Sequence, residues 1–346
     1  MNLQHSLIAS AILAVALSAP LAPAANAQEQ PIEMKASMFL PPASSFNKGI
    51  DKWIAEVHEK SKGKLKISVF PGSQMGPPPR QFDLVRTGVA DFGLVLHGLT
   101  PGRFTLTELA HLPGAITSGY VGSRALAEVG PEILKADHPG VKILHVGTIS
   151  PMPVISKKEV SKASDLKGTR IRAAGSVQSA VLEALGSVPV LIQPGEMNEA
   201  LTKGMIDGAS VGYSGMVTFH LTDAGKFVFE GDLGSVTFAF VMNQASYDKL
   251  PPDLKKVIDE TSGANGNHFM ARALEEEEQT LRAKYQKEGI KIQRLTDDGP
   301  LREASAKIRE TAIKTAEAKG LPAKEFLDKL KAATEKYKDA NYKDAK

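Results

Sequence analysis

The sequence predicts an α/β protein with two domains. In the N-terminal part, strand-like runs at residues 34–40, 65–70 and 90–96 alternate with two helical segments. Between Asp165 and Asp207, a strand, a helix, a second strand and a second helix follow one another. This alternation is typical of parallel, doubly wound sheets. With 346 residues, the chain is long enough for two domains of ordinary size.

The first helix and the second strand are predicted from the spacing of their apolar residues. Four apolar residues between Phe46 and Val57 recur at helical spacing, after a serine pair at 44–45 that can cap a helix. Apolar residues at 65, 67 and 69 then alternate with polar ones, which predicts a strand. Trp53 lies on the apolar face of the helix, so we expect it in the core rather than against a ligand.

Residues 1–27 are predicted to be a secretory signal peptide. They contain no Lys, Arg, Asp or Glu, and their apolar run, residues 7–19, precedes the cleavage-type sequence Ala25-Asn26-Ala27. A membrane anchor is the alternative, but the run is short for one and two prolines follow it. We therefore expect cleavage before Gln28 and a mature protein in the periplasm.

The composition excludes several classes of protein. The chain has no cysteine, which excludes a disulfide scaffold, a thiolate metal site and a cysteine nucleophile. The net charge is only +3, and no basic patch is interleaved with aromatic residues, so no nucleic-acid partner is expected. The eight histidines lack the spacing of metal ligands, and no glycine-rich phosphate motif occurs. We predict neither a metal site nor a cofactor.

The sequence Gly208-Ala-Ser-Val-Gly212 matches the pattern of a serine nucleophile elbow. Asp223 and His268 could complete a catalytic triad. An elbow requires the serine at a sharp turn between a strand and a helix, whereas Ser210 falls inside a short predicted strand. An exported serine esterase that uses Ser210 is therefore the alternative interpretation, and we expect no enzyme and no catalytic residue.

Two arginines lie two residues apart on the strand-like run of residues 169–173, so they share a face if the strand is regular. At a strand end beside an interdomain crevice, one such guanidinium can bind both oxygens of a carboxylate. Residues 173–175 are small, and Ser176 can cap a following helix whose N-terminus favours an anion. The pattern predicts an anion site, with a solvated arginine pair as the alternative.

Five further motifs occur in a fixed order along the chain: KGKLKISVFPG at 62–72, RTGVAD at 86–91, DLKGTRIR at 165–172, ALGSVPV at 184–190 and EMNEALTKGMIDG at 196–208. Through them the mature chain resembles the periplasmic solute-binding proteins of TRAP (tripartite ATP-independent periplasmic) transporters, of the dicarboxylate-binding type. The resemblance implies capture of a small organic acid in an interdomain cleft and delivery to integral membrane TRAP subunits. A monomer is expected.

The resemblance also implies a periplasmic-binding-protein-like fold with hinge strands and a long helix that spans both domains. The expected boundaries are 28–149 with 238–278 for domain I, 150–237 with 279–335 for domain II, and a polar tail at 336–346. Residues 264–286 can form the long helix. Its run of four glutamates, Glu275–Glu278, is expected to be a solvated face rather than a metal cluster.

The resemblance implies that Arg172 grips the carboxylate of the ligand and that Phe39 and His97 form part of the pocket wall. After Asp207-Gly208, many relatives carry an asparagine that supports this carboxylate, and this chain has Ala-Ser-Val-Gly instead. We expect the support to come from Ser210 or Tyr213, if it is present.

A second arginine, which some relatives place soon after the crossover strand, is also absent, because this chain has Thr148-Ile-Ser150 there. A monocarboxylate with an apolar body is therefore expected as the ligand. The candidate walls of its pocket are Phe39, His97, Met152 and Tyr213.

Overall fold

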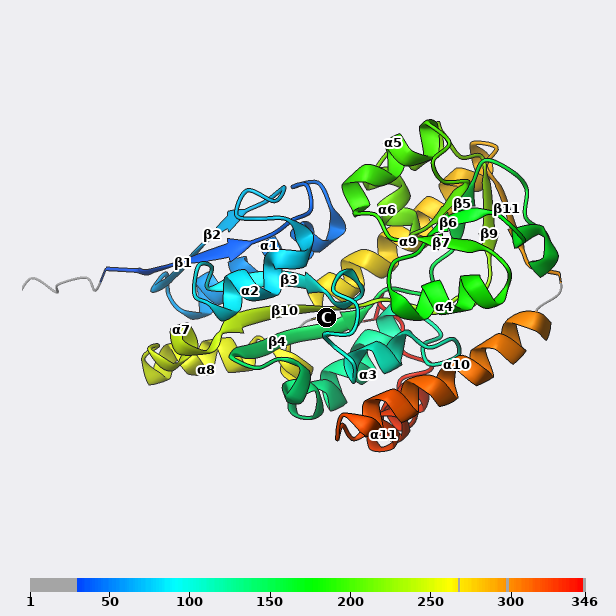
Figure 1. Cartoon of the computed structure of the whole chain (residues 1–346). Coiled ribbons are helices and arrows are strands. Elements are labelled where there is room, and N and C mark those ends of the chain that lie inside the picture. The colour runs from blue at the N-terminus through cyan, green and yellow to red at the C-terminus, as the bar shows by residue number, and fades with distance from the viewer. Residues whose placement is uncertain (1–29, 267, 297–298, 345–346) are drawn as a thin grey trace, which may run out of the picture. The chain divides into compact units, whose positions relative to one another are not determined.

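The computed structural model describes residues 30–266, 268–296 and 299–344, and the predicted signal peptide lies outside the described residues. Residues 31–346 form one compact unit, to which all elements named below belong. The unit contains two sheets, which Figure 1 shows with helices packed around each. The α/β class predicted from the alternation of strands and helices is confirmed.

The first sheet has five strands in the order β2-β1-β3-β10-β4. Their bounds are Ile32–Ser37 for β1, Leu65–Phe70 for β2, Phe92–Leu96 for β3, Val141–Thr148 for β4 and Thr237–Asn243 for β10. β10 runs antiparallel to both of its neighbours, and every one of its residues is buried. Because it lies between two strands and under helices on both faces, its sequence is a continuous apolar run rather than an alternating one.

The second sheet has six strands in the order β11-β9-β5-β8-β6-β7. Their bounds are Val154–Ser156 for β5, Arg170–Arg172 for β6, Val188–Val190 for β7, Gly208–Ser210 for β8, Phe227–Glu230 for β9 and Lys291–Arg294 for β11. β6 is parallel to both β7 and β8, as the strand-helix-strand pattern of residues 165–211 predicts. The carboxyl ends of these strands therefore lie at one edge of the sheet, where open α/β sheets place ligands.

The helices have the following bounds: α1 Ser45–Lys60, α2 Gln81–Arg86, α3 Gly119–Ile133, α4 Ser176–Ala184, α5 Met197–Thr202, α6 Tyr213–Thr218, α7 Gln244–Asp248, α8 Pro252–Glu260, α9 Phe269–Lys287, α10 Gly299–Ala318 and α11 Ala323–Lys336. Ser44 caps α1 by accepting a hydrogen bond from the Asn47 N–H, so the first of the two predicted serines is the cap. Trp53 is 1% exposed in the core, and its indole N–H donates to the Thr261 carbonyl over 3.1 Å.

α9 corresponds to the long helix expected at residues 264–286, but it begins at Phe269, because residues 263–265 form a separate 3-10 turn. It packs against α1 and α3, which cover the first sheet, and against α6, whose Tyr213 and Met216 pack on strands of the second sheet. α11, near the C-terminus, packs against α3. Within the described ranges, no helix is both long and apolar enough to cross a membrane.

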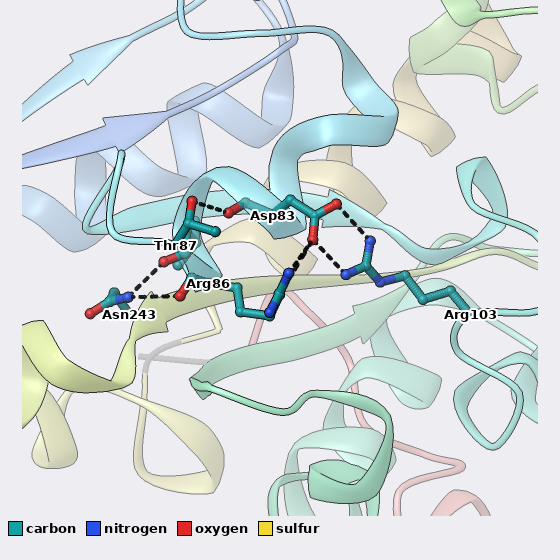
Figure 2. A network of polar contacts seen from close by, with 6 residues as sticks. Asp83, Arg86, Thr87, Arg103 and Asn243 are labelled. Atoms are coloured by element: carbon teal, nitrogen blue, oxygen red, sulfur yellow. Dashed lines mark hydrogen bonds and ion pairs between the residues drawn. The ribbon is translucent and has the colours of Figure 1, made fainter.

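A polar network ties β10 to α2, as Figure 2 shows. The Asn243 side-chain amide donates to the carbonyls of Val85 and Arg86 over 2.7 and 3.3 Å, which satisfies acceptors at the end of α2. Asp83, on the same helix, accepts from Arg103 at both carboxylate oxygens over 2.7 and 2.9 Å. The Arg103 guanidinium holds the pKa of this carboxyl down at about 2, against the opposing effect of burial. These contacts fix the strand that returns to the first sheet.

Candidate ligand site

Two arginines on β6 have different surroundings. Arg170 is exposed and binds both carboxylate oxygens of Asp207, over 3.0 and 3.1 Å. Arg172 is the last residue of β6 and is 3% exposed. It is buried because β6 lies between β7 and β8. Arg170 therefore has its counter-ion within the protein. Arg172 is the arginine whose surroundings remain to be described.

The guanidinium of Arg172 binds only main-chain oxygens. Its Nη1 donates to the Ser210 carbonyl over 2.7 Å and its Nε to the Ile192 carbonyl over 3.4 Å. A guanidinium has five N–H donors, and among the described residues no carboxylate lies within ion-pair distance of this one. Burial lowers the pKa of Arg172 to about 10, so the group stays protonated at neutral pH. The protein holds a buried positive charge whose anionic partner is not one of the described side chains.

Arg172 opens on a cavity of about 80 Å³, lined by residues from both sheets and from α1, α6 and α9. A space of this volume holds roughly five to eight water molecules, or one small organic molecule. Its lining residues are Phe39, Leu40, Ser44, Ser45, Phe46, Leu96, Leu99, Ile149, Met152, Arg172, Ala174, Pro194, Met197, Val211, Gly212, Ser214, Gly215, Thr218, Phe219, Val236 and Leu274. Arg172 is the one charged residue of this lining, and most of the others are apolar.

The hydroxyl groups in the cavity wall already have partners. Ser45 donates to the Glu277 carboxylate, Ser214 donates to Glu278 over 2.7 Å, and Thr218 donates to the Ser214 carbonyl over 2.9 Å. The remaining hydroxyl, that of Ser44, accepts the capping bond at the start of α1. Arg172 is therefore the strong polar anchor that the cavity offers to a ligand.

The ends of β3 and β6 touch beside the cavity. A Cβ atom placed on Gly98, just after β3, would lie 2.2 Å from the Ala174 carbonyl oxygen, just after β6. The Ser176 hydroxyl also donates to the Glu108 carboxylate over 2.7 Å. These contacts join segments that follow a strand of each sheet, and the first requires that residue 98 has no side chain.

Three residues that the sequence analysis placed at the ligand lie on this cavity, namely Arg172, Phe39 and Met152. His97 is fully buried, and its ring nitrogens lie 2.8 Å from the Thr237 hydroxyl and 2.9 Å from the His138 ring. Burial holds the pKa of His97 well below its ordinary value. The ring is part of the packing around the first sheet and is not among the cavity-lining residues.

Tyr213 and Ser210 lie near the cavity without lining it. The Tyr213 hydroxyl donates to the Glu230 carboxylate over 2.8 Å, away from Arg172. The Ser210 hydroxyl oxygen is buried and has no hydrogen-bond partner among the described residues. The Ser210 carbonyl, in contrast, accepts from Arg172, so this residue contributes its main chain to the site. A buried serine without a base beside it is no nucleophile in this conformation.

A larger cleft of about 980 Å³ lies against α9 and α10, and its walls carry charges of both signs. Glu230 in this cleft is bound by Arg282 over 2.6 and 3.0 Å, and Arg309 donates to the Pro113 carbonyl over 3.0 Å. Arg282 is paired with Glu230, and the charge of Arg309 interacts with that of Asp232 in the same cleft, so the cleft offers an incoming anion less uncompensated charge than Arg172 does.

Two buried glutamates of α9 lie beside the site, and sequence reasoning missed them. The expectation that Glu275–Glu278 form a solvated face is wrong for the first and last of them, which are 9% and 8% exposed. Glu278 accepts from the N–H groups of Tyr213 and Ser214, both over 2.8 Å. A signal was present in the sequence, because Leu274, Glu278, Leu281 and Tyr285 recur at helical spacing on one buried face.

Comparison with known proteins gives concordant matches. The model of the bacterial extracellular solute-binding proteins, family 7, matches residues 36–318. A TRAP solute binding protein from Rhodoferax ferrireducens T118, in complex with copurified benzoate, is 26% identical, with a TM-score of 0.83 over 89% of this chain and 99% of that one. A marine metagenome TRAP solute binding protein specific for aromatic acid ligands, with 3-hydroxybenzoate, is 30% identical, with a TM-score of 0.83 over 89% of this chain and 99% of that one.

A third similar structure is the TRAP periplasmic solute binding protein from Bordetella bronchiseptica with bound (R)- and (S)-mandelate. It is 26% identical, with a TM-score of 0.82 over 88% of this chain and 99% of that one. Together the three structures confirm the expected two-domain α/β fold. The matches are to solute receptors and not to enzymes, so the serine esterase alternative is not supported.

Proposed function

The chain belongs to the bacterial extracellular solute-binding proteins of family 7, and on this premise we propose that its ligand is a monocarboxylate with an apolar, aromatic body. As a member of that family it is a solute receptor of TRAP-type transport that works in the periplasm and binds small carboxylates. The proposal adds the class of acid and the residues that hold it: Arg172 on the carboxylate, with Phe39 and Met152 among the walls.

The buried Arg172 is the observation that carries this proposal. Leaving one member of a buried ion pair without its partner costs about 3–5 kcal/mol. In the described structure this guanidinium has main-chain acceptors but no carboxylate. Its free N–H groups can form the planar, two-bonded contact that a carboxylate matches and a neutral group does not. A ligand carboxylate would therefore remove the penalty of the closed, desolvated site.

The apolar lining of the cavity favours a ligand whose remaining part, apart from its one carboxylate, is apolar and aromatic. A second carboxylate on the ligand would be buried without a cation, because Arg172 is the one charged residue in the lining. Phe39, Phe46 and Phe219 line the cavity, and their rings can pack against an aromatic ring. The similar structures with bound benzoate, 3-hydroxybenzoate and mandelate support the same class of ligand.

The remaining steps of the function follow from closure around the ligand. We propose that two domains, residues 28–149 with 238–278 and residues 150–237 with 279–318, close over the acid by bending near residues 149–150 and 237–238. The predicted second domain extended to residue 335, but α11 packs against α3 and belongs with the first domain. A monomer in the closed form then docks on the membrane subunits of the transporter. Closure is favoured by the ligand because Arg172 is paired only when the cavity is occupied.

A thermal-shift and calorimetry panel tests the ligand class. Benzoate, 3-hydroxybenzoate and mandelate are compared with succinate and malate, and with benzamide, which has the shape of benzoate without its charge. A ligand at 100 times its Kd stabilises the protein by about 2.7 kcal/mol, a readily visible shift. We expect shifts with the aromatic monocarboxylates alone. Binding of succinate as tight as that of benzoate, or of benzamide as tight as benzoate, would contradict the proposal.

A further inference from the structure

Two buried carboxylates on α9, one turn apart, each bind the first residues of another helix. Glu275 accepts from the Tyr120 N–H at the start of α3 over 3.2 Å, and Glu278 accepts from two N–H groups at the start of α6. A carboxylate at a helix N-terminus pairs with unsatisfied N–H donors and with the positive end of the helix dipole. α3 packs on the first sheet and α6 on the second, so α9 anchors one helix on each side.

The hydrogen bonds to Glu278 are shorter than those to Glu275, which accepts from the Tyr120 N–H, the Ser150 hydroxyl and the Gln279 amide over 3.2, 3.4 and 2.9 Å. Its Oε2 accepts from the Tyr213 N–H over 2.8 Å, and its Oε1 accepts from both the N–H and the hydroxyl of Ser214, over 2.8 and 2.7 Å. No lysine or arginine of the described residues forms an ion pair with it. The carboxylate of Glu278 thus binds only the start of α6. Because the side chain is buried, water would not replace hydrogen bonds that are lost there.

The short segment of residues 210–214 connects this carboxylate to the ligand site. At one end, the Ser210 carbonyl accepts from Arg172 over 2.7 Å. At the other end, residues 213 and 214 bind Glu278. Between them, a Cβ atom on Gly212 would lie 2.7 Å from the Glu278 carboxylate, so the chain passes against that carboxylate at a distance that glycine allows. Residues 211, 212, 214 and 215 also line the cavity.

We propose that Glu278 is a positioning residue for ligand binding: it holds residues 210–214 so that the Ser210 carbonyl orients the guanidinium of Arg172 and α6 forms one wall of the cavity. The inference rests on the proposed carboxylate site at Arg172. Glu278 itself does not touch the ligand.

The variant Glu278→Gln tests the role without changing the size of the side chain. One carboxylate oxygen becomes an amide nitrogen, which cannot accept from either N–H group. Glu276→Gln is the matched control, because Glu276 lies two residues away on the same helix and is exposed. Calorimetry with benzoate should show an affinity about tenfold or more lower for E278Q, the loss expected for a hydrogen bond to a charged group, and within about twofold of wild type for E276Q.

A second measurement separates positioning from general support of the fold. The Nε–H resonance of Arg172 in ¹H–¹⁵N spectra, assigned by its absence in Arg172→Lys, reports the orientation of the guanidinium without any ligand. We expect it to shift or broaden in E278Q and to stay unchanged in E276Q. If E278Q does not fold, Glu278→Asp replaces it, because aspartate keeps the charge on a shorter side chain. E278D should then change the benzoate affinity and the Arg172 resonance relative to wild type.

The two readouts also separate this inference from the proposed function. An Arg172 resonance and a benzoate affinity in E278Q equal to those in E276Q would overturn the positioning role, even if E278Q melts at a lower temperature. A wild-type protein that binds none of the aromatic acids would contradict the proposed ligand class, while the Arg172 resonance would still decide whether Glu278 orients the guanidinium.

Discussion

The guanidinium of Arg172 and the main-chain oxygen of Ser210 are joined by a hydrogen bond of 2.7 Å in the interior of the protein. The neutral carbonyl of Ser210 orients the guanidinium of Arg172 but does not compensate its positive charge. A carboxylate side chain at the same place would have neutralised the arginine and removed its reason to bind an anion. The proposed contact between Arg172 and a ligand carboxylate rests on this choice of partner.

Replacing Arg172 by lysine should lower the affinity for benzoate by about a hundredfold, because an ammonium cannot form two parallel hydrogen bonds to a carboxylate and reaches less far. Arg170→Lys is the matched control, since Arg170 is exposed and pairs with Asp207. Isothermal calorimetry measures both. Equal affinities of R172K and R170K would remove Arg172 from the ligand contact.

Adding a methyl group at Gly98 should impair binding. The new Cβ would meet the Ala174 carbonyl oxygen at 2.2 Å, so the ends of β3 and β6 could no longer touch beside the cavity. We expect Gly98→Ala to raise the Kd for benzoate about tenfold or more, in the range of overpacking penalties. Gly195→Ala is the control, because nothing lies within 4 Å of a Cβ there. Unchanged affinity in G98A would show that this contact is not needed for binding.

Ligand binding should make the protein more compact. Because Arg172 is paired only when the cavity is occupied, the empty protein is expected to open and the acid to shift it to the closed form. Small-angle X-ray scattering with and without saturating benzoate measures the radius of gyration. We expect a decrease on binding for wild type and none for R172K. Identical scattering of the free and the benzoate-saturated wild-type protein would contradict closure.

Stability should fall as the pH is lowered below about 6.5. Burial, with a smaller effect of His268, lowers the pKa of His145 from its ordinary value of 6.5 to about 3. Between pH 6.5 and pH 3, His145 binds a proton in the unfolded chain but not in the folded one. The contribution of His145 to the free energy of unfolding is therefore complete above pH 6.5 and is lost as the pH falls toward 3. Between pH 7 and pH 5, one such histidine accounts for about 2 kcal/mol.

The variant His145→Phe isolates this effect. The His145 ring packs edge-on against Trp53 with 5.9 Å between centroids, beside a void of about 20 Å³ that can take up part of a phenyl ring. Urea unfolding at pH 7 and pH 5 should show a pH dependence about 2 kcal/mol smaller in H145F than in wild type. The buried acids Glu108 and Glu278, whose pKa values burial raises, act with the opposite sign but equally in both proteins. The same pH dependence of stability in both proteins would show that protonation of His145 does not cause it.

Much of the fold could be predicted from patterns between residues close in the sequence. The helix of Ser45–Lys60 and the strand of Leu65–Phe70 follow from apolar spacing, capping and alternation, each set by a few neighbouring residues. The pair Arg170 and Arg172 was found in the same way, on a strand before three small residues, and the resemblance to the solute-binding proteins singled out Arg172 of the two. These features depend on local geometry, which the order of residues specifies directly.

The surroundings of the site depend instead on segments that meet only in the folded chain. His97 was expected at the ligand, but its ring is held by Thr237 and His138, far away in sequence. The acidic run on α9 was expected in water, but Glu278 is drawn inside by two N–H groups at the start of α6. A glutamate alone favours solvent, and only free N–H donors at the end of a packed helix make its burial favourable. Local patterns therefore identified the pair of arginines, and long-range packing buried Arg172 and selected the main-chain partners that orient it.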